Sequence, residues 1–282
     1  LSPANAEAET LALLRTAAEE DKDCGRWLTR NVLPHRHPQL RAVMLSFKRL
    51  GYAPGDATAE QMEAAADLAD RFSASELRVT HEQNLILPWV RRDQLPALYK
   101  AAKALGLAQP NIGLLTDMIA CPGGDFCSLA NARSLPIAEA ITERYQDLDE
   151  LWDLGEIDLH ISGCINSCGH HHSGHIGILG VDKDGKEWYQ ITLGGADGSD
   201  LSGPAQPGKV IGPSFSASEV PGVIEALLAT YRAQRQLLPA DAARAAQGQK
   251  YEHFIDTVRR VGIEPFKAAG NAARHPAAEA TA

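Results

Sequence analysis

The sequence predicts an α+β fold in which a small sheet domain precedes a larger mixed α/β domain. Between residues 41 and 105 the hydrophobic pattern runs strand, helix, strand, strand, helix, which is typical of a compact α+β sheet domain. Between residues 128 and 237, predicted helices flank short apolar strands and a hairpin. The chain has 282 residues, 44% hydrophobic and 22% charged, which is an ordinary globular composition sufficient for one large or two modest domains.

The first sheet domain is predicted over residues 39–106. Thr58 is placed to cap its first helix, and Gln61 completes a capping box. Met62 is expected in the apolar stripe of that helix. The predicted elements are strands at 41–47, 76–80 and 84–89 and helices at 59–72 and 93–105.

The second domain is predicted over residues 107–237. A short apolar strand at 158–162 leads into a cysteine-rich turn. The other predicted elements are helices at 128–145 and 218–237, a hairpin at 176–181 and 187–193, and a last strand at 210–215.

The two ends of the chain are predicted to be simpler. Residues 1–38 hold a surface helix over 1–23 and a proline-bounded linker. Residues 238–282 hold one helix over 251–261 and an alanine-rich tail that we expect to be disordered from Ala268.

Four of the five cysteines form two pairs. Five residues separate Cys121 from Cys127, three separate Cys164 from Cys168, and 36 residues lie between the pairs. Four thiolates are the ligand set of a cubane iron–sulfur cluster, and soft thiolate ligands select iron–sulfur, zinc or copper(I). Cys24 lies far from both pairs and is predicted to be a small buried apolar residue.

Two other interpretations of the cysteines remain open. Structural zinc sites favour about two to four residues between paired ligands, which the first gap fits poorly. The histidines at 170, 171, 172 and 175 are interpreted as a polar turn near a cofactor and not as metal ligands. Disulfides need an oxidising compartment, whereas the sequence shows no signal-peptide pattern, so we expect reduced thiols and a cytoplasmic protein.

The flanking residues carry a resemblance to a known family. Its motifs are Ala-Cys-x5-Cys-x-Leu-Ala, Ser-Gly-Cys-x-Asn-x-Cys-Gly, Gly-His-Ile-Gly-Ile-Leu-Gly and a downstream Tyr-Gln-Ile-Thr-Leu-Gly-Gly. They resemble the sirohaem-dependent nitrite/sulfite reductase family, in particular the C-terminal half of the sulfite reductase haemoproteins, over about residues 25–265. The resemblance implies a ferredoxin-like half-domain over 39–106, followed by a mixed α/β domain over 107–237 that binds sirohaem and a 4Fe–4S cluster.

The resemblance also implies roles for residues of the cysteine motifs. By motif position Cys121, Cys127, Cys164 and Cys168 hold the 4Fe–4S cluster, and Cys168 bridges to the sirohaem iron as well. Asn166 is expected either to shape the loop through a hydrogen bond or to occupy a left-handed turn position.

Further residues of the sirohaem pocket are implied upstream. Thr80, Gln83 and Asn84 are expected to donate hydrogen bonds to the many carboxylates of sirohaem, whereas Arg78 is expected to be a strand-edge charge. The family usually has an arginine after the last Cys-Gly, and this chain has His170 there, so no fixed positive charge is implied.

The implied activity is the six-electron reduction of sulfite to sulfide in sulfur assimilation, with reduction of nitrite to ammonia as the alternative. The sequence has no phosphate loop or dinucleotide fingerprint, so electrons are expected from a separate ferredoxin or flavoprotein reductase. The family's anion-binding residues come mainly from its first half. We therefore assign no catalytic residue here and expect a chain that begins at Leu1 to be the C-terminal half of a longer enzyme, inactive alone.

Charge and hydropathy limit the remaining classes. A formal net charge of −9 argues against nucleic acid or an anionic membrane surface as a partner. No apolar run reaches the roughly 18 residues of a membrane-spanning helix. Two other classes stay open, an iron–sulfur electron carrier without sirohaem and a zinc-stabilised binding module.

Overall fold

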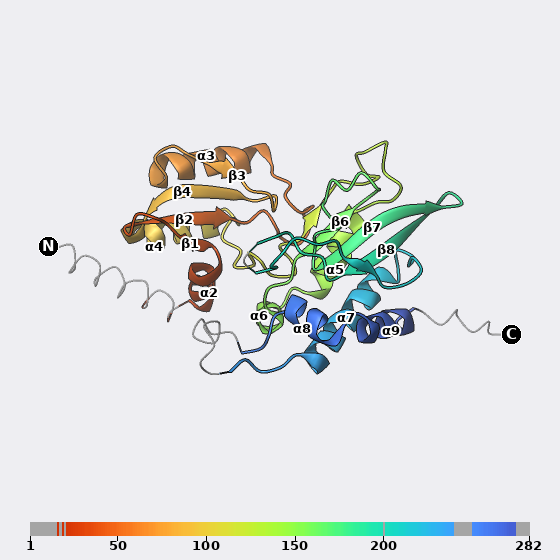
Figure 1. The fold of residues 1–282 in the computed structure, drawn as a ribbon. Coiled ribbons are helices and arrows are strands. Elements are labelled where there is room, and N and C mark those ends of the chain that lie inside the picture. Colours follow the sequence, from red (N-terminus) through yellow and green to blue (C-terminus); the bar gives the residue numbers. More distant parts are fainter. Residues whose placement is uncertain (1–15, 17–18, 20, 200, 240–249, 275–282) are drawn as a thin grey trace. The chain divides into compact units, whose positions relative to one another are not determined.

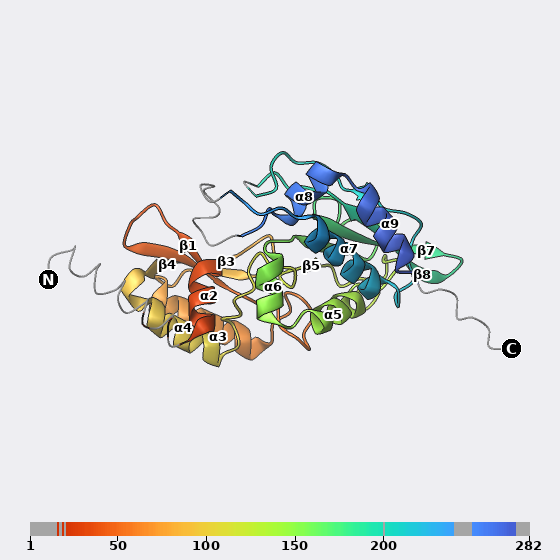
Figure 2. The same ribbon diagram turned by 90° about the horizontal axis from the view of Figure 1, so that it is seen from below.

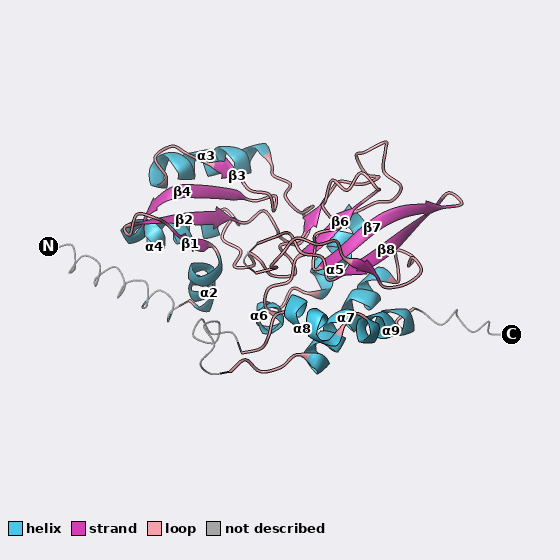
Figure 3. Cartoon of the chain, in the orientation of Figure 1, coloured by secondary structure: helices cyan, strands magenta, loops and turns pink. Residues whose placement is uncertain are grey.

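The computed structural model describes residues 21–199, 201–239 and 250–274, together with Thr16 and Glu19. It divides into two compact units, Leu1–Ile112 (unit 1) and Gly113–Ala282 (unit 2). Each unit contains one sheet with helices packed on it (Figures 1 and 3), which confirms the predicted α+β class. The helix predicted over 1–23 lies almost entirely outside the described residues.

Unit 1 is built on a four-stranded antiparallel sheet in the order β1-β2-β4-β3. In its centre Val43 pairs with Leu87, and both side chains are fully buried. The strands are β1 (Val32–Pro34), β2 (Leu40–Leu45), β3 (Arg78–Val79) and β4 (Leu85–Arg91). The helices are α2 (Lys22–Arg30), α3 (Ala59–Phe72), the 3-10 turn η1 (Arg92–Gln94) and α4 (Leu95–Ala104).

Helix α3 has the predicted bounds because its start is fixed by its own side chains. The Gln61 amide donates to Thr58 Oγ1 at 3.2 Å, and Gln61 Oε1 accepts from the Thr58 amide at 2.9 Å, so the capping box is confirmed. Met62 is 46% exposed, so its assignment to the apolar stripe is wrong. The buried face begins one turn later, at Ala65. Cys24 is 2% exposed within α2, which confirms it as a small buried residue.

Unit 2 is built on a five-stranded mixed sheet in the order β5-β6-β7-β8-β9. The first three strands run parallel, and β8 and β9 are antiparallel to their neighbours. Asp184 (φ +56°) and Gly185 (φ +74°) make the two-residue β7–β8 turn, in which both central residues need positive φ. The strands are β5 (Ile119–Ala120), β6 (Leu159–Ser162), β7 (Ile176–Lys183), β8 (Lys186–Leu193) and β9 (Lys209–Val210).

Three expectations for unit 2 are corrected. The helix predicted from residue 128 begins at Leu135, because the amides of Asn131 and Ala132 donate to the Gly163 carbonyl and hold the preceding stretch in a loop. The strand predicted over 210–215 stops at Val210. The tail expected to be disordered from Ala268 is helical to Ala272. The helices are α5 (Leu135–Arg144), α6 (Leu148–Leu154), α7 (Val220–Gln234), α8 (Phe254–Val261) and α9 (Glu264–Ala272).

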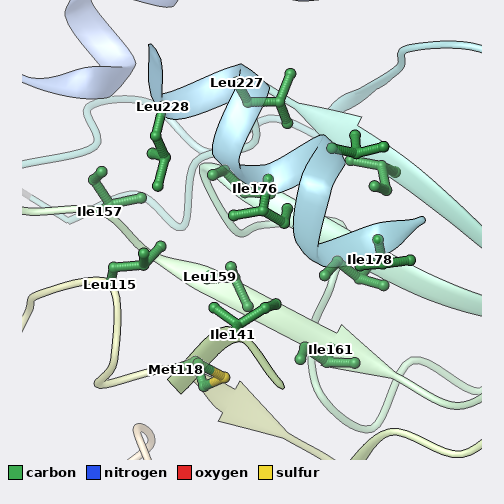
Figure 4. Close-up of a cluster of buried hydrophobic side chains, with 14 of the residues drawn as sticks. Leu115, Met118, Ile141, Ile157, Leu159, Ile161, Ile176, Ile178, Leu227 and Leu228 are labelled. Carbon is green, nitrogen blue, oxygen red and sulfur yellow. The ribbon is translucent and has the colours of Figure 1, made fainter. Parts of the chain in front are cut away.

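The helices of unit 2 bury one face of its sheet. In Figure 4, Ile161 and Ile178 of the strands belong to one buried cluster with Ile141 of α5 and with Leu227 and Leu228 of α7. Helix α9 lies alongside α7 (Figure 2). Strand β6 alternates apolar and polar residues, Leu-His-Ile-Ser, so that every second side chain enters this core. The intervening polar residues face the opposite side of the sheet.

Candidate functional site

Two cysteine-bearing segments begin at the same edge of the unit 2 sheet. Cys121 directly follows β5, and Cys164 lies two residues beyond the end of β6. The two strands are parallel neighbours, and the Cys121 amide donates to the Ile161 carbonyl at 3.1 Å. Carboxyl ends of neighbouring parallel strands form the usual ligand edge of an α/β sheet.

Glycines allow the two segments to pack directly on each other. A Cβ on Gly163 would lie 2.7 Å from the Gly123 Cα and 2.7 Å from the Ala132 carbonyl oxygen. Gly123 has φ +59°, and a Cβ there would lie 2.5 Å from the Ser134 nitrogen. Any side chain at either position would force the segments apart.

The first thiol is held by a backbone donor from the second segment. The Gly163 amide donates to Cys121 Sγ at 3.1 Å, and Ser134 Oγ lies 3.6 Å from the same sulfur. Amide-to-sulfur hydrogen bonds stabilise thiolate charge and adjust the potential of iron–sulfur clusters. With four soft donors and this bond, the residues present fit a thiolate-held cluster.

The second pair lies on a run of consecutive turns. The Ser167 amide donates to the Cys164 carbonyl at 3.1 Å, and the His170 amide donates to the Ser167 carbonyl at 2.8 Å. The residues that take the left-handed backbone are Ser167 (φ +57°) and His170 (φ +53°). Asn166 does not, so its interpretation as a left-handed turn residue is wrong. Its side chain is exposed, and its role as a hydrogen-bonding residue stays a prediction.

The thiols differ in exposure, and large apolar side chains stand beside them in solvent. Cys164 is buried and Cys168 is exposed, whereas Cys121 and Cys127 are intermediate. On the same two segments, Phe126 and Ile165 are each 80% exposed, and Leu129 is 69% exposed. Large exposed apolar side chains are typical of a surface that another group covers.

The chain from the second pair to β7, which we call the return segment (residues 169–175), lies flat on the sheet face opposite the helices. The Gly169 amide donates to Ser162 Oγ at 3.1 Å, and His160 Nδ1 lies 2.9 Å from the His170 carbonyl oxygen. A Cβ on Gly177 would lie 2.0 Å from the His171 carbonyl oxygen, closer than any side chain permits. The segment therefore connects two parallel strands without a helix.

The histidines of this stretch divide into exposed and buried ones. His170 and His172 are exposed, whereas His171 and His175 are buried. His171 Nδ1 lies 3.2 Å from Ser167 Oγ, and its Nε2 has no hydrogen-bond partner among the described residues. Burial lowers the pKa of His171 to about 4, so its imidazole is neutral at neutral pH.

A second polar group lies at the amino ends of β6 and β7. His175 Nε2 lies 2.9 Å from Ser202 Oγ, and its Nδ1 accepts from the Asp158 amide at 3.2 Å. Burial lowers the pKa of His175 to about 4 and raises that of the Asp158 carboxyl to about 6. These groups satisfy one another at the sheet end away from the cysteines.

Sequence patterns alone did not identify this network or the role of the return segment. The available signal was the Leu159–Ser162 alternation, which places His160 and Ser162 on a face that something polar must cover. No local pattern indicated which segment covers it.

The described part of the chain holds no group of three or more His, Cys, Asp or Glu side chains placed to bind one metal ion. That convergence is what a single ion requires. In a cubane cluster each iron takes one thiolate, so the four sulfur atoms surround the cluster and do not meet at a point.

The residues proposed upstream for sirohaem lie in unit 1, where they shape the β3–β4 turn. Thr80 Oγ1 accepts from the Asn84 amide at 3.2 Å, and Gln83 has φ +58°. Asn84 is 1% exposed, and its Oδ1 accepts from the Phe47 amide at 3.0 Å. Arg78 lies at the sheet edge, paired with Glu76 at 2.5 Å. The sirohaem contacts of Thr80, Gln83 and Asn84 stay predictions.

Comparison with protein families gives one match in each unit. Residues 45–105 match the nitrite/sulfite reductase ferredoxin-like half domain. Residues 114–273, more than half of the chain, match the nitrite and sulphite reductase 4Fe-4S domain. In the part of the chain that the structure describes, no helix is long and apolar enough to cross a membrane.

Curated relatives carry both substrate names. The chain is 35% identical over 207 residues to the chloroplastic ferredoxin–nitrite reductase of Zea mays, covering 67% of this chain and 34% of the relative. It is 33% identical over 222 residues to the ferredoxin–nitrite reductase of Synechococcus elongatus (77% and 41%). It is 30% identical over 178 residues to sulfite reductase [ferredoxin] 2 of Mycolicibacterium paratuberculosis (59% and 32%). The chain thus spans 32–41% of the length of these relatives.

Solved structures agree on the fold. The NirA protein of Mycobacterium tuberculosis superposes with a TM-score of 0.60 at 24% identity, covering 83% of this chain and 42% of that one. Dissimilatory sulfite reductase I gives a TM-score of 0.63 at 16% identity, covering 82% and 69%. With a ferredoxin-like half-domain followed by the 4Fe–4S domain, the chain belongs to the nitrite/sulfite reductase family.

Proposed function

We propose that this chain is the cluster-bearing part of a sirohaem- and 4Fe–4S-dependent reductase of a small oxyanion, nitrite or sulfite. One observation carries the proposal. The two cysteine segments pack on each other at the carboxyl ends of β5 and β6, within the stretch that matches the family's 4Fe–4S domain. Four thiolates at one sheet edge are the ligand set that such a cluster requires.

The four thiols differ in exposure, and we propose roles for them that follow this difference. Cys121, Cys127, Cys164 and Cys168 would hold the cluster, and Cys168, the exposed thiol, would be the residue shared with the sirohaem. When bound, the cluster and the sirohaem supply the single-electron steps of a six-electron reduction. A thiol that serves two metals must be accessible from outside the cluster loop, which is the property that distinguishes Cys168.

The chain's own residues hold and shield this edge. The Gly163 amide stabilises negative charge on Cys121 Sγ, and buried Cys164 is removed from solvent. Exposed Phe126 and Ile165 offer an apolar surface to a macrocycle or to another part of the enzyme, which would keep water away from the thiolates.

Two substrates stay in the proposal, each supported by a different observation. The motif resemblance favours sulfite. The relatives from Zea mays and Synechococcus elongatus, at 35% and 33% identity, are named nitrite reductases, which supports nitrite as the first anion to assay. The names of these relatives also support a ferredoxin as electron donor ahead of a flavoprotein reductase.

The chain covers only part of the length of its relatives, and this bears on whether the chain alone is active. Because the chain spans about a third of the Zea mays enzyme, we place the anion-binding residues and the rest of the sirohaem pocket outside it, and we propose that the chain alone does not turn over. Activity assays therefore belong to an enzyme that contains this chain together with the rest of the family architecture.

The cluster is tested on the chain itself. After anaerobic reconstitution we expect about four iron atoms and four labile sulfides per chain. Cys121→Ser, Cys127→Ser and Cys164→Ser should each lose most of both, whereas Cys24→Ser, a buried thiol of unit 1, should keep them. Zinc in place of iron would support a zinc-stabilised module and overturn the proposal, as would wild-type iron in all three variants.

The sirohaem is tested in the longer enzyme. Cys168→Ser should change or abolish the tetrapyrrole absorption bands and should remove reduction of both nitrite and sulfite. A parent enzyme that binds a cluster but no tetrapyrrole would support an iron–sulfur electron carrier. Unchanged bands and unchanged cluster–haem coupling in Cys168→Ser would exclude the bridging role.

A further inference from the structure

We propose that His171 is a positioning residue for Cys168, because its buried imidazole holds the Ser167 hydroxyl and with it the turn that carries the thiol. The proposal assigns a role outside the ligand set, and it rests on the proposed function only for the statement that Cys168 binds iron. Burial singles out this residue. His171 is 1% exposed, whereas its neighbours His170 and His172 are exposed.

The backbone conformation of Ser167 determines the position of the adjacent Cys168. The Ser167 amide donates to the Cys164 carbonyl at 3.1 Å, and its carbonyl accepts from the His170 amide at 2.8 Å, so it belongs to the turns on both sides of the thiol. The backbone of Ser167 has φ +57°, in a region that residues other than glycine seldom occupy. Such a conformation persists only where its surroundings hold it.

His171 supplies the side-chain contact that holds Ser167. Its Nδ1 lies 3.2 Å from Ser167 Oγ, within one hydrogen bond. The backbone of His171 is itself fixed, because its carbonyl oxygen packs directly on strand β7 at Gly177. A Cβ added at Gly177 would lie only 2.0 Å from this oxygen. Strand β7, His171, Ser167 and Cys168 thus form one continuous chain of contacts from the sheet to the exposed thiol.

The second ring nitrogen shows that this is more than a packing contact. His171 Nε2 is buried and has no hydrogen-bond partner among the described residues. A neutral imidazole has one donor and one acceptor nitrogen, so a side chain present for volume alone would leave an avoidable unsatisfied polar atom. An apolar residue would fill the same space without that cost, and the imidazole is explained by the bond that Nδ1 makes to the turn.

The experiment measures amide hydrogen exchange at Ser167 and His170 in the complete chain without cluster. In His171→Phe, which removes both nitrogens, both amides should exchange about tenfold faster, as expected for the loss of one hydrogen bond. His171→Asn places a polar atom near the position of Nδ1 and should stay within about twofold of the parent. His171→Gln places its polar atoms near Nε2 and should resemble His171→Phe. The exposed neighbour provides the control, because His172→Phe should change neither amide.

Two results would overturn the proposal, namely parental exchange rates in His171→Phe or an equal increase in His172→Phe. If circular dichroism shows that His171→Phe does not fold, Ser167 gives the second test. Ser167→Ala removes the hydroxyl that His171 contacts, so the His170 amide should exchange about tenfold faster, as in His171→Phe. Parental exchange in Ser167→Ala would also overturn the proposal.

A cluster measurement separates this proposal from the proposed function. In the reconstituted chain, His171→Phe should lose iron to a chelator several-fold faster than His171→Asn, with an altered electron paramagnetic resonance spectrum of the reduced cluster. A parent chain that assembles no cluster would refute the proposed function, and the exchange rates would still decide the role of His171.

Discussion

The two ends of strands β6 and β7 close in opposite ways. At their amino ends, His175 and Ser202 are fully buried and bond to each other, and Asp158 completes the group. At their carboxyl ends, Cys168 is exposed and Ile165 is 80% exposed. The amino end satisfies its polar groups internally and needs nothing from outside. The carboxyl end leaves the Cys168 thiol and the Ile165 side chain uncovered, and it is the edge at which we propose that the cluster binds.

The largest expected effect on stability comes from displacing the return segment, which packs on the sheet between these two ends. In Gly177→Ala the new Cβ would lie 2.0 Å from the His171 carbonyl oxygen, so the return segment must leave the sheet. We expect a loss of about 3 kcal/mol or more in the free energy of unfolding, measured by urea denaturation. Gly222→Ala in α7 has nothing within 4 Å and should be neutral or stabilise by up to about 1 kcal/mol. Equal effects would show that the close contact is absent in solution.

A pair of variants should separate the two ends by what each one changes. His175→Leu leaves the Asp158 amide without its partner and removes one of the two hydrogen bonds of Ser202 Oγ, so we expect a loss of about 2–4 kcal/mol. Its iron content after reconstitution should stay at the parental level. Cys168→Ser should do the reverse, with stability of the chain without cluster within about 0.5 kcal/mol and impaired cluster assembly. The comparison fails if either variant changes both properties equally.

The amino end should also contribute to the pH dependence of stability, together with His171, whose pKa is likewise lowered to about 4. The pKa of His175 falls from 6.5 to about 4 on folding, so its contribution is present above pH 6.5 and is lost as the pH drops toward 4. The Asp158 carboxyl has a pKa raised from 3.8 to about 6, so its contribution is present below pH 3.8 and is lost as the pH rises through 6. The two oppose each other between pH 4 and 6.

Substituting either His175 or Asp158 should expose the pH-dependent contribution of the other residue to stability. In Asp158→Asn the unfolding free energy should rise more steeply with pH between 4 and 6, by up to about 1.4 kcal/mol per pH unit. His175→Gln should make the dependence shallower over the same range. Urea denaturation at a series of pH values measures both slopes, and identical slopes in the two variants would show that this pair does not control the acid side.

The smallest effect on stability is expected at the open edge. Ile165→Ser removes an 80% exposed apolar side chain and should change the unfolding free energy by less than about 0.5 kcal/mol while reducing self-association in light scattering. Ile178→Ser, at a fully buried position in β7, should cost several times more. A large loss in Ile165→Ser would mean that the edge is covered within the chain itself.

The sequence was informative where a feature depends on neighbouring residues. Helix α3 was predicted because Thr58, Gln61 and the apolar spacing act within one segment. The start of α5 was missed because the residues before Leu135 have a helical pattern but are held by the carbonyl of Gly163, which lies far along the chain. Helix α9 carried a local signal, Glu264 followed by a proline, inside a stretch interpreted from its alanine content.

The same distinction applies to the candidate site. The cysteine spacing is local, so the two pairs were recognised from the sequence. The placement of the return segment depends on a bare backbone at Gly177 and on His160 of another strand, so its buried histidines were not distinguished from their exposed neighbours. Packing of distant segments decides which residue of a polar run is buried.

The missing helix between β6 and β7 bears on the order in which the site assembles. Strand β6, the return segment, β7 and β8 are contiguous over residues 159–193, so their contacts close short loops and can form early. Cys121 and Cys127 join only when β5 docks on β6, after a separation of 36 residues between the pairs. We expect Cys164 and Cys168 to reach their folded positions while Cys121 and Cys127 are still mobile. Docking of β5 on β6 would then be the folding step that brings all four thiols to one edge of the sheet, and a cluster could be inserted only after it.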